Sequence, residues 1–141
     1  MSDKVYDGMT IEDMMAFVQT LGLRAERAGG SENLLLSSAG GWRFAIYMNA
    51  APGEKKFTNV QLYAAHEDRS FTIGDGNDWN NDKRFAKAHS DADGYPVIEY
   101  DFFVDGISEA NLRRIFTMWE VLMSLFMEQM GKGGGKTFVR A

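Results

Sequence analysis

The sequence predicts a single α+β domain in which an antiparallel sheet is covered by an N-terminal helix and a long C-terminal helix. The order of patterns carries this prediction, because a helical periodicity comes first, alternating segments follow and a second helical periodicity comes last. The chain has 141 residues and is 45% hydrophobic, which suits one domain with a real core. We assign residues 1–130 to this domain and residues 131–141 to a flexible Gly/Lys tail.

The first predicted helix begins after Thr10, which is a good N-cap residue. Asp13 stands three residues later, as in a capping box. Apolar side chains then recur at helical spacing as far as Leu21, and Gly22 ends the helix.

Strand patterns occupy the middle of the chain. Apolar and polar residues alternate with a period of two, as they do in a half-buried strand. An Asp-Gly pair at positions 93 and 94 separates the last two alternating segments, which predicts a hairpin. The predicted strands lie at residues 34–36, 42–49, 57–65, 85–89 and 97–104.

Residues 74–83 are polar and rich in Asn, Asp and Gly, which predicts a loop with a short helical turn. The side chains of this acidic loop could also hold a hard cation. Trp79 stands alone among them. A large aromatic residue in such a segment is either tucked into the core or held at the surface as an anchor for a partner.

The C-terminal helix is predicted to run from its N-cap, Ser108, to Met130. One apolar stripe should cover the sheet, and a second set of apolar residues widens the apolar surface beyond what one contact uses. Either the helix is buried on two sides within its own domain, or the second set meets another chain, which favours a homodimer. The stripe comprises Leu112, Ile115, Phe116, Trp119, Leu122, Met123 and Phe126, and the second set comprises Met118, Val121 and Leu125.

Composition excludes several classes of function. The net charge of −5 argues against nucleic-acid binding, which needs a basic surface. The absence of cysteine removes thiolate nucleophiles and cysteine-based metal sites, and it is compatible with a reducing cytoplasm. No secretory signal and no apolar run of membrane-spanning length is visible, so we expect a cytoplasmic protein that does not enter a membrane.

Three apparent motifs do not meet the requirements of their chemistry. In the Gly/Lys tail, Met130 stands where a P-loop needs its first glycine. Around Gly94, His89 and Tyr100 stand where an EF-hand needs oxygen ligands. His66 and His89 have no partners at metal-ligand or nucleophile spacing. We therefore expect no enzymatic activity, no cofactor and no bound metal.

Short motifs in the second half of the chain resemble those of the YbjN-type family of bacterial sensory transduction regulators. The resemblance is best over residues 76–126. The motifs are Asn77-Asp-Trp-Asn80, Arg84-Phe-Ala-Lys87, Asp91-x-Asp-Gly94, Glu99-x-Asp101 and Ser108-Glu-Ala-Asn-Leu112.

The resemblance implies a fold like that of type III secretion chaperones, with a curved antiparallel sheet interrupted by a short helical segment. Such chaperones commonly dimerise and present surfaces to peptide segments of partner proteins. The resemblance supplies no catalytic residue. It does single out five residues that could brace the turn entering a strand, namely Asn77, Trp79, Asn80, Arg84 and Phe85.

The sequence thus predicts a non-enzymatic regulatory or chaperone-like module that binds a protein partner and forms a homodimer. Met118, Val121 and Leu125 are the residues expected at the interface. The alternative is a small-molecule or ion sensor that uses the loop at residues 74–84.

Overall fold

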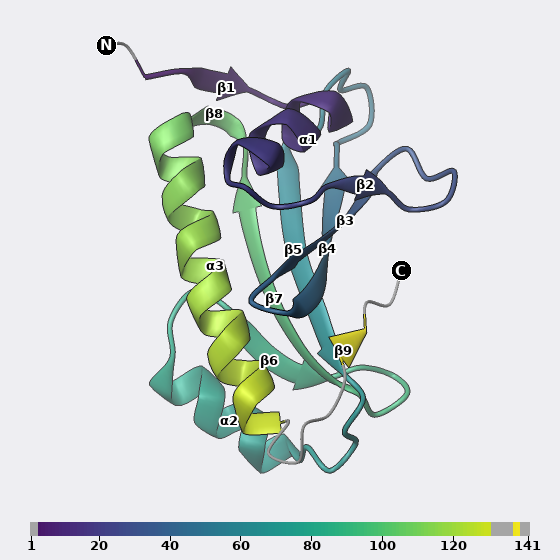
Figure 1. Cartoon of the computed structure of the whole chain (residues 1–141), viewed down its shortest axis with the longest axis vertical. Helices are drawn as coiled ribbons and strands as arrows, with labels where there is room; N and C mark the ends of the chain where they lie inside the picture. The colour runs from purple at the N-terminus through teal and green to yellow at the C-terminus, as the bar shows by residue number, and fades with distance from the viewer. Residues whose placement is uncertain (1–2, 131–136, 139–141) are drawn as a thin grey trace.

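A long helix lies along one face of an antiparallel sheet in the computed structural model, which describes residues 3–130 and 137–138 (Figure 1). The other two helices sit near its two ends, with α1 close to its beginning and α2 beside its C-terminal end. The elements in chain order are β1 (Val5–Asp7), α1 (Ile11–Thr20), β2 (Glu26–Arg27), β3 (Leu34–Ala39), β4 (Trp42–Asn49), β5 (Asn59–His66), α2 (Ile73–Asp82), β6 (Lys87–Ser90), β7 (Pro96–Phe103), β8 (Asp105–Ser108), α3 (Glu109–Met130) and β9 (Thr137–Phe138).

The main sheet has the strand order β2-β3-β4-β5-β7-β6, and β9 pairs with the end of β5. Every pairing is antiparallel, with Ile46 opposite Leu62 and Leu62 opposite Tyr100 in the three central strands. The predicted α+β class with an antiparallel sheet is therefore confirmed. The Asp-Gly hairpin is also present between β6 and β7, where the Asp91 carboxylate accepts hydrogen bonds from the N–H groups of Asp93 and Tyr95.

The core lies between α3 and the sheet face that α3 covers. Alternate residues of the strands point to this face and are almost fully buried, and burying one such side chain contributes roughly 1.5–3 kcal/mol. Rings from the helices meet rings from the sheet edge to face, as Trp119 does with Phe44 at 5.7 Å between centroids. The buried sheet residues include Leu35, Phe44, Ile46, Met48, Val60, Leu62, Ala64 and Ile98.

The first helix has the predicted capping box. The Asp13 N–H donates to Thr10 Oγ1 at 3.0 Å, and the Thr10 N–H donates to Asp13 Oδ2 at 2.9 Å. These bonds satisfy two donors at the helix start. The helix ends at Thr20, and Gly22 follows with a φ of 80°, a left-handed conformation that favours glycine.

A separate two-stranded sheet ties the N-terminal segment to the start of α3. In it β1 pairs with β8, with Val5 opposite Ser108. The Tyr6 hydroxyl donates to Glu109 Oε2 at 3.1 Å, and burial together with this carboxylate raises the pKa of Tyr6 to about 12. The Glu109 N–H donates to the Lys4 carbonyl at 2.7 Å, so strand and helix start are joined by main chain and side chain.

The prediction of a loop with a short helical turn at residues 74–83 is wrong, because α2 (Ile73–Asp82) is a helix of ten residues. A capping box that the sequence analysis overlooked starts it. The Asp75 N–H donates to Thr72 Oγ1 at 3.1 Å, and the Thr72 N–H donates to Asp75 Oδ2 at 2.9 Å. Gly76 faces β6, where an added Cβ would lie 3.3 Å from the Ala88 carbonyl oxygen. The small residue therefore lets the helix approach the strand closely.

The long C-terminal helix is confirmed as α3, with Ser108 Oγ accepting from the Asn111 N–H at 3.1 Å. Its predicted stripe is buried, apart from the half-buried Ile115, and Met127 joins the buried set. Across residues 3–130 and 137–138, no helix combines the length and hydropathy that crossing a membrane requires. The tail predicted at 131–141 lies outside the described residues, except for the two residues of β9.

Candidate functional site

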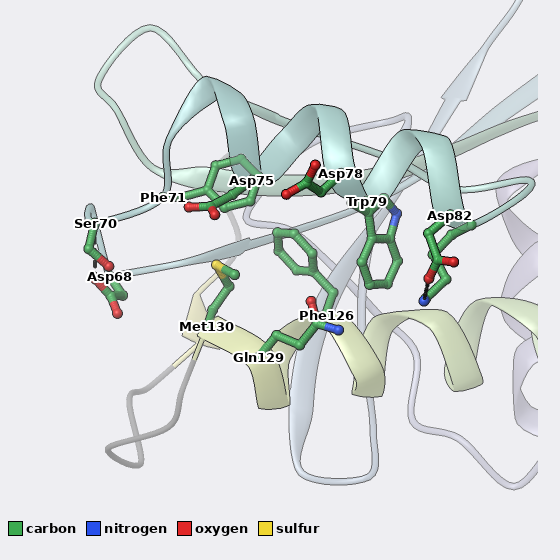
Figure 2. Close-up of a pocket in the computed structure, with 11 residues that line it drawn as sticks. Asp68, Ser70, Phe71, Asp75, Asp78, Trp79, Asp82, Phe126, Gln129 and Met130 are labelled. Atoms are coloured by element: carbon green, nitrogen blue, oxygen red, sulfur yellow. Dashed lines mark hydrogen bonds and ion pairs between the residues drawn. The ribbon is translucent and has the colours of Figure 1, made fainter.

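A groove of about 720 Å³ lies between α2 and the last turns of α3 (Figure 2). Figure 2 shows Trp79 pointing from α2 toward Phe126 of α3, with Asp68 and Ser70 at one end of the groove and Asp82 at the other. We call this cavity the α2–α3 groove. It is lined by Asp68, Ser70, Phe71, Asp75, Asp78, Trp79, Asp82, Lys83, Phe126, Gln129 and Met130.

Three aromatic rings close the floor of the α2–α3 groove. Phe126 meets Trp79 at 5.4 Å and Phe71 at 5.8 Å between centroids, both edge to face. Trp79 is only 5% exposed, and its Nε1–H donates to the Ala86 carbonyl at 3.1 Å. Of the two alternatives for Trp79, the structure therefore shows the residue tucked into the core.

One wall of the groove is acidic. Asp75, Asp78 and Asp82 recur at spacings of three and four residues, which places them on one face of α2. Asp82 forms an ion pair with Lys83, and the Lys83 ammonium lies 5.4 Å from the centre of the Trp79 ring. Asp68 adds a fourth carboxylate from the segment before the helix.

These carboxylates differ in their hydrogen-bond and ion-pair partners. Asp75 Oδ2 caps α2 by accepting the Thr72 N–H. Asp68 Oδ1 accepts the Ser70 N–H at 2.9 Å, and hydrogen bonds from Ser70 lower the pKa of Asp68. Asp78 has no ion-pair partner within the described parts of the chain. The Asp78 side chain is exposed on α2.

The aspartates of the groove do not converge on a single point. Among residues 3–130 and 137–138, no three His, Cys, Asp or Glu side chains come close enough together to hold a metal ion. A hard cation such as Ca²⁺ needs six to eight oxygen ligands around one centre. The carboxylates are instead spread along α2 and the segment before it.

Two residues of the resemblance motif fasten α2 to the sheet. The Asn80 side chain donates through Nδ2 to the Ala88 carbonyl at 3.0 Å and accepts the Ala88 N–H through Oδ1 at 2.8 Å. Trp79 bonds to Ala86 in the segment that enters β6. These bonds join α2 to β6 and to the segment that enters it, whereas Asn77 is exposed on α2.

Phe85 is the strained member of the motif. Its φ is 76°, a left-handed conformation that costs an L-residue about 1–2 kcal/mol. The ring is 57% exposed and stacks on Tyr100 with centroids 6.1 Å apart and planes at 10°. The Arg84 guanidinium lies 5.1 Å from the centre of the same ring. The turn therefore presents an aromatic ring and a cation at the surface beside β7.

A family comparison covers nearly all of these elements. The model of the YbjN family, described as putative bacterial sensory transduction regulators, matches residues 10–132. The chain belongs to the YbjN family. No curated protein matches the chain significantly. The YbjN match runs from the capping residue of α1 to just past the end of α3, and it confirms the resemblance recognised in the motifs.

In this YbjN-family chain, the residues expected at an interface lie on the exposed side of α3. Val121 is 53% exposed and Leu125 is 41% exposed, one helical turn apart. Met118 is half-buried and packs against the core, so the domain itself covers part of it. Gln129 follows Leu125 by one further turn and lines the α2–α3 groove. The exposed row of α3 therefore continues into the groove wall.

The opposite face of the sheet carries a cluster of polar and charged side chains around Glu99. Glu99 Oε1 lies 3.4 Å from Lys87 Nζ and 3.2 Å from His89 Nε2, and Gln61 Nε2 donates to Glu99 Oε2 at 3.2 Å. The Glu99 side chain is only 12% exposed. These contacts cross from β5 through β7 to β6. Such cross-strand pairs stabilise sheets, so we interpret the cluster as structural.

Proposed function

We propose that this YbjN-family chain is a cytoplasmic, non-enzymatic regulatory module that acts by binding protein, in a chaperone-like manner, and that it works as a homodimer. The proposal rests on the exposed row of α3. Val121 and Leu125 expose 53% and 41% of their surface although the opposite side of the helix is buried in the core. Adjacent exposed apolar side chains are typical of interaction surfaces.

A two-fold dimer is the simplest way to cover this row. The 22 residues of α3 extend for about 33 Å, so two copies packed side by side would share several turns. In such a pair, Val121 and Leu125 of one protomer would meet the same residues of its partner, because a two-fold interface uses one patch twice. The flexible side chain of Met118 beside them suits an adaptable contact.

The dimer is tested by analytical ultracentrifugation at micromolar concentration. We expect the wild-type chain to sediment as a dimer and the Val121→Glu/Leu125→Glu variant to sediment as a monomer that keeps its helical circular dichroism. Phe103→Glu is the matched control, because Phe103 is also an exposed apolar residue but lies on β7 and not on α3. A wild-type chain that stays monomeric would rule out the dimer.

The second candidate function is a small-molecule or ion sensor that uses the segment around α2. The α2–α3 groove favours it, because about 720 Å³ is within the range of ligand pockets. Isothermal titration calorimetry against divalent cations and common nucleotides tests it. We expect binding heat that Asp78→Asn removes, and the absence of heat with every compound would argue against a sensor of this kind.

A further inference from the structure

We propose that the α2–α3 groove binds a basic peptide segment of a partner protein, in which lysine or arginine side chains alternate with apolar ones. This inference rests on the proposed protein-binding function and names the chemistry of the partner. It does not depend on the dimer, since the acidic wall of the groove lies on α2 and Val121 is not among the residues that line the groove.

The apolar side chains of the peptide would meet the floor and edge of the groove. Phe71, Trp79 and Phe126 form a continuous aromatic floor, and the half-buried Met130 stands at its edge. Methionine at the margin of a groove adapts to side chains of different shapes. A cavity of about 720 Å³ accommodates several side chains at once. Because the three rings are at most 8% exposed, the peptide would contact only their edges, and Met130 would supply most of the apolar contact.

The cationic side chains would meet the wall formed by α2. Asp75 and Asp78 are three residues apart on one helix face, which places neighbouring side chains about 5–6 Å apart. Asp68 lies at the end of the groove beyond them. Because these negative charges are spread along the groove, they complement a ligand with more than one separated positive charge.

Lys83 of the chain itself is an example of a cation bound at this acidic wall. The ammonium of Lys83 pairs with the Asp82 carboxylate and lies 5.4 Å from the centre of the Trp79 ring. A cation over an indole face is attracted by the ring in addition to the carboxylate. One turn earlier, Asp78 offers a carboxylate without an ion-pair partner among the described residues. A lysine or arginine of the peptide would supply there what Lys83 supplies to Asp82.

The test is a fluorescence anisotropy titration of the full chain with a labelled peptide of alternating lysine and leucine. We expect micromolar binding that weakens as salt is added, because exposed ion pairs are screened. Replacing lysine by glutamate in the peptide should abolish binding, and replacing leucine by serine should weaken it at least tenfold. Spermidine, which has spaced cations but no apolar side chains, should not displace the peptide at equal concentration.

Variants of the chain locate the binding to the groove. Asp78→Asn should weaken peptide binding by up to about fivefold, since it removes an exposed charge from the wall. Met130→Gln should also weaken binding, since it places a polar group where the edge offers apolar surface. Asp105→Asn is the charge-matched control, because Asp105 is exposed on β8. Circular dichroism verifies that each variant is folded.

Four results would overturn the proposal. The first is equal binding of the lysine and glutamate peptides, and the second is displacement of the peptide by spermidine at equal concentration. The third is peptide binding that Asp78→Asn and Asp105→Asn change to the same extent. The fourth comes from Val121→Glu. Val121→Glu separates this proposal from the dimer, since it should abolish dimerisation and leave peptide affinity unchanged. If Val121→Glu abolished peptide binding as well, the groove would not be the site.

Discussion

The indole of Trp79 meets the ring of Phe126 edge to face, with centroids 5.4 Å apart and planes at 84°. This contact joins α2 to the C-terminal end of α3, two helices that are distant in the sequence. Phe71 packs on the same ring, so Phe126 is shared by both sides of the groove. Aromatic pairs of this kind contribute about 0.5–1.5 kcal/mol beyond their buried area. The floor of the groove therefore helps to hold the two helices together.

The hydrogen bond from Trp79 to Ala86 should contribute measurably to the free energy of unfolding. Trp79→Phe keeps a ring but removes the donor from the Ala86 carbonyl, and leaving such a group unpaired costs about 1–3 kcal/mol. Trp119→Phe is the matched control, because Trp119 is fully buried and its Nε1 has no hydrogen-bond partner among residues 3–130 and 137–138. In urea unfolding, Trp79→Phe should lose more free energy of unfolding than Trp119→Phe. Equal losses would mean that the bond contributes nothing.

The capping box of α2 should contribute to the stability of that helix. Thr72→Ala removes the oxygen that accepts the Asp75 N–H, and losing a cap of this type costs about 1 kcal/mol. Thr72→Ser keeps a hydroxyl and should stay close to the wild type. Urea unfolding measures the cost, and amide hydrogen exchange should show faster exchange in the first turn of α2 for Thr72→Ala only. Identical behaviour of the two variants would contradict this assignment.

The left-handed backbone at Phe85 predicts an unusual order of stabilities. Phe85→Ala and Phe85→Gly both remove the ring that stacks on Tyr100. Glycine adopts a φ of 76° without steric cost, whereas alanine keeps the strain. We therefore expect Phe85→Gly to be more stable than Phe85→Ala by up to about 1 kcal/mol. Thermal unfolding gives the order, and an alanine variant at least as stable as the glycine variant would show that the strain is absent.

Buried His66 should make the fold sensitive to mild acid. Its Nδ1 accepts the Asp68 N–H at 3.0 Å, and burial lowers the pKa of His66 below the ordinary value of 6.5, although Asp68 and Glu67 oppose this shift. As pH falls, His66 of the unfolded chain therefore binds a proton at a higher pH than His66 of the folded chain. The free energy of unfolding should decrease as pH falls through 6.5 and continue to decrease to the pKa of the folded chain.

Urea unfolding above and below this pH checks the prediction. His66→Asn cannot titrate and retains an oxygen that can accept the Asp68 N–H, so it should flatten the pH dependence. His89→Asn is the control, because His89 is exposed on β6. This variant should keep the pH dependence that His66 causes. A steep decline that persists in His66→Asn would assign the effect to other groups.

Local chemistry explains why much of the fold was predictable. The first helix carries its cap at Thr10 and its stop at Gly22, and the β6–β7 hairpin carries an Asp-Gly turn, so each element is specified by a few adjacent residues. The second helix has a cap of the same kind at Thr72. Its two glycines and its many Asn and Asp residues nevertheless give it a low intrinsic helix preference. Tertiary contacts of Gly76 and Trp79 with the sheet and α3 outweigh that preference.

The groove could not be predicted in the same way. Its carboxylates come from residues 68–82, but Phe126 and Met130 come from the last turns of α3. Nothing in the sequence shows that these segments meet, because helical periodicity says which face of a helix is buried and not what covers it. By contrast, the exposed row on α3 could be predicted, because the positions of Val121 and Leu125 follow from the periodicity of a single helix.

The pairing of β1 with β8 has a consequence for how the chain reaches its native state. Tyr6 and its acceptor Glu109 are 103 positions apart, so the first strand is synthesised long before its partner exists. Contacts between such distant positions form slowly, because a long loop must close before they can contribute. On the ribosome, β1 must remain unpaired until residues 105–109 have emerged. Closure of this end of the domain is therefore among the last steps of its biogenesis.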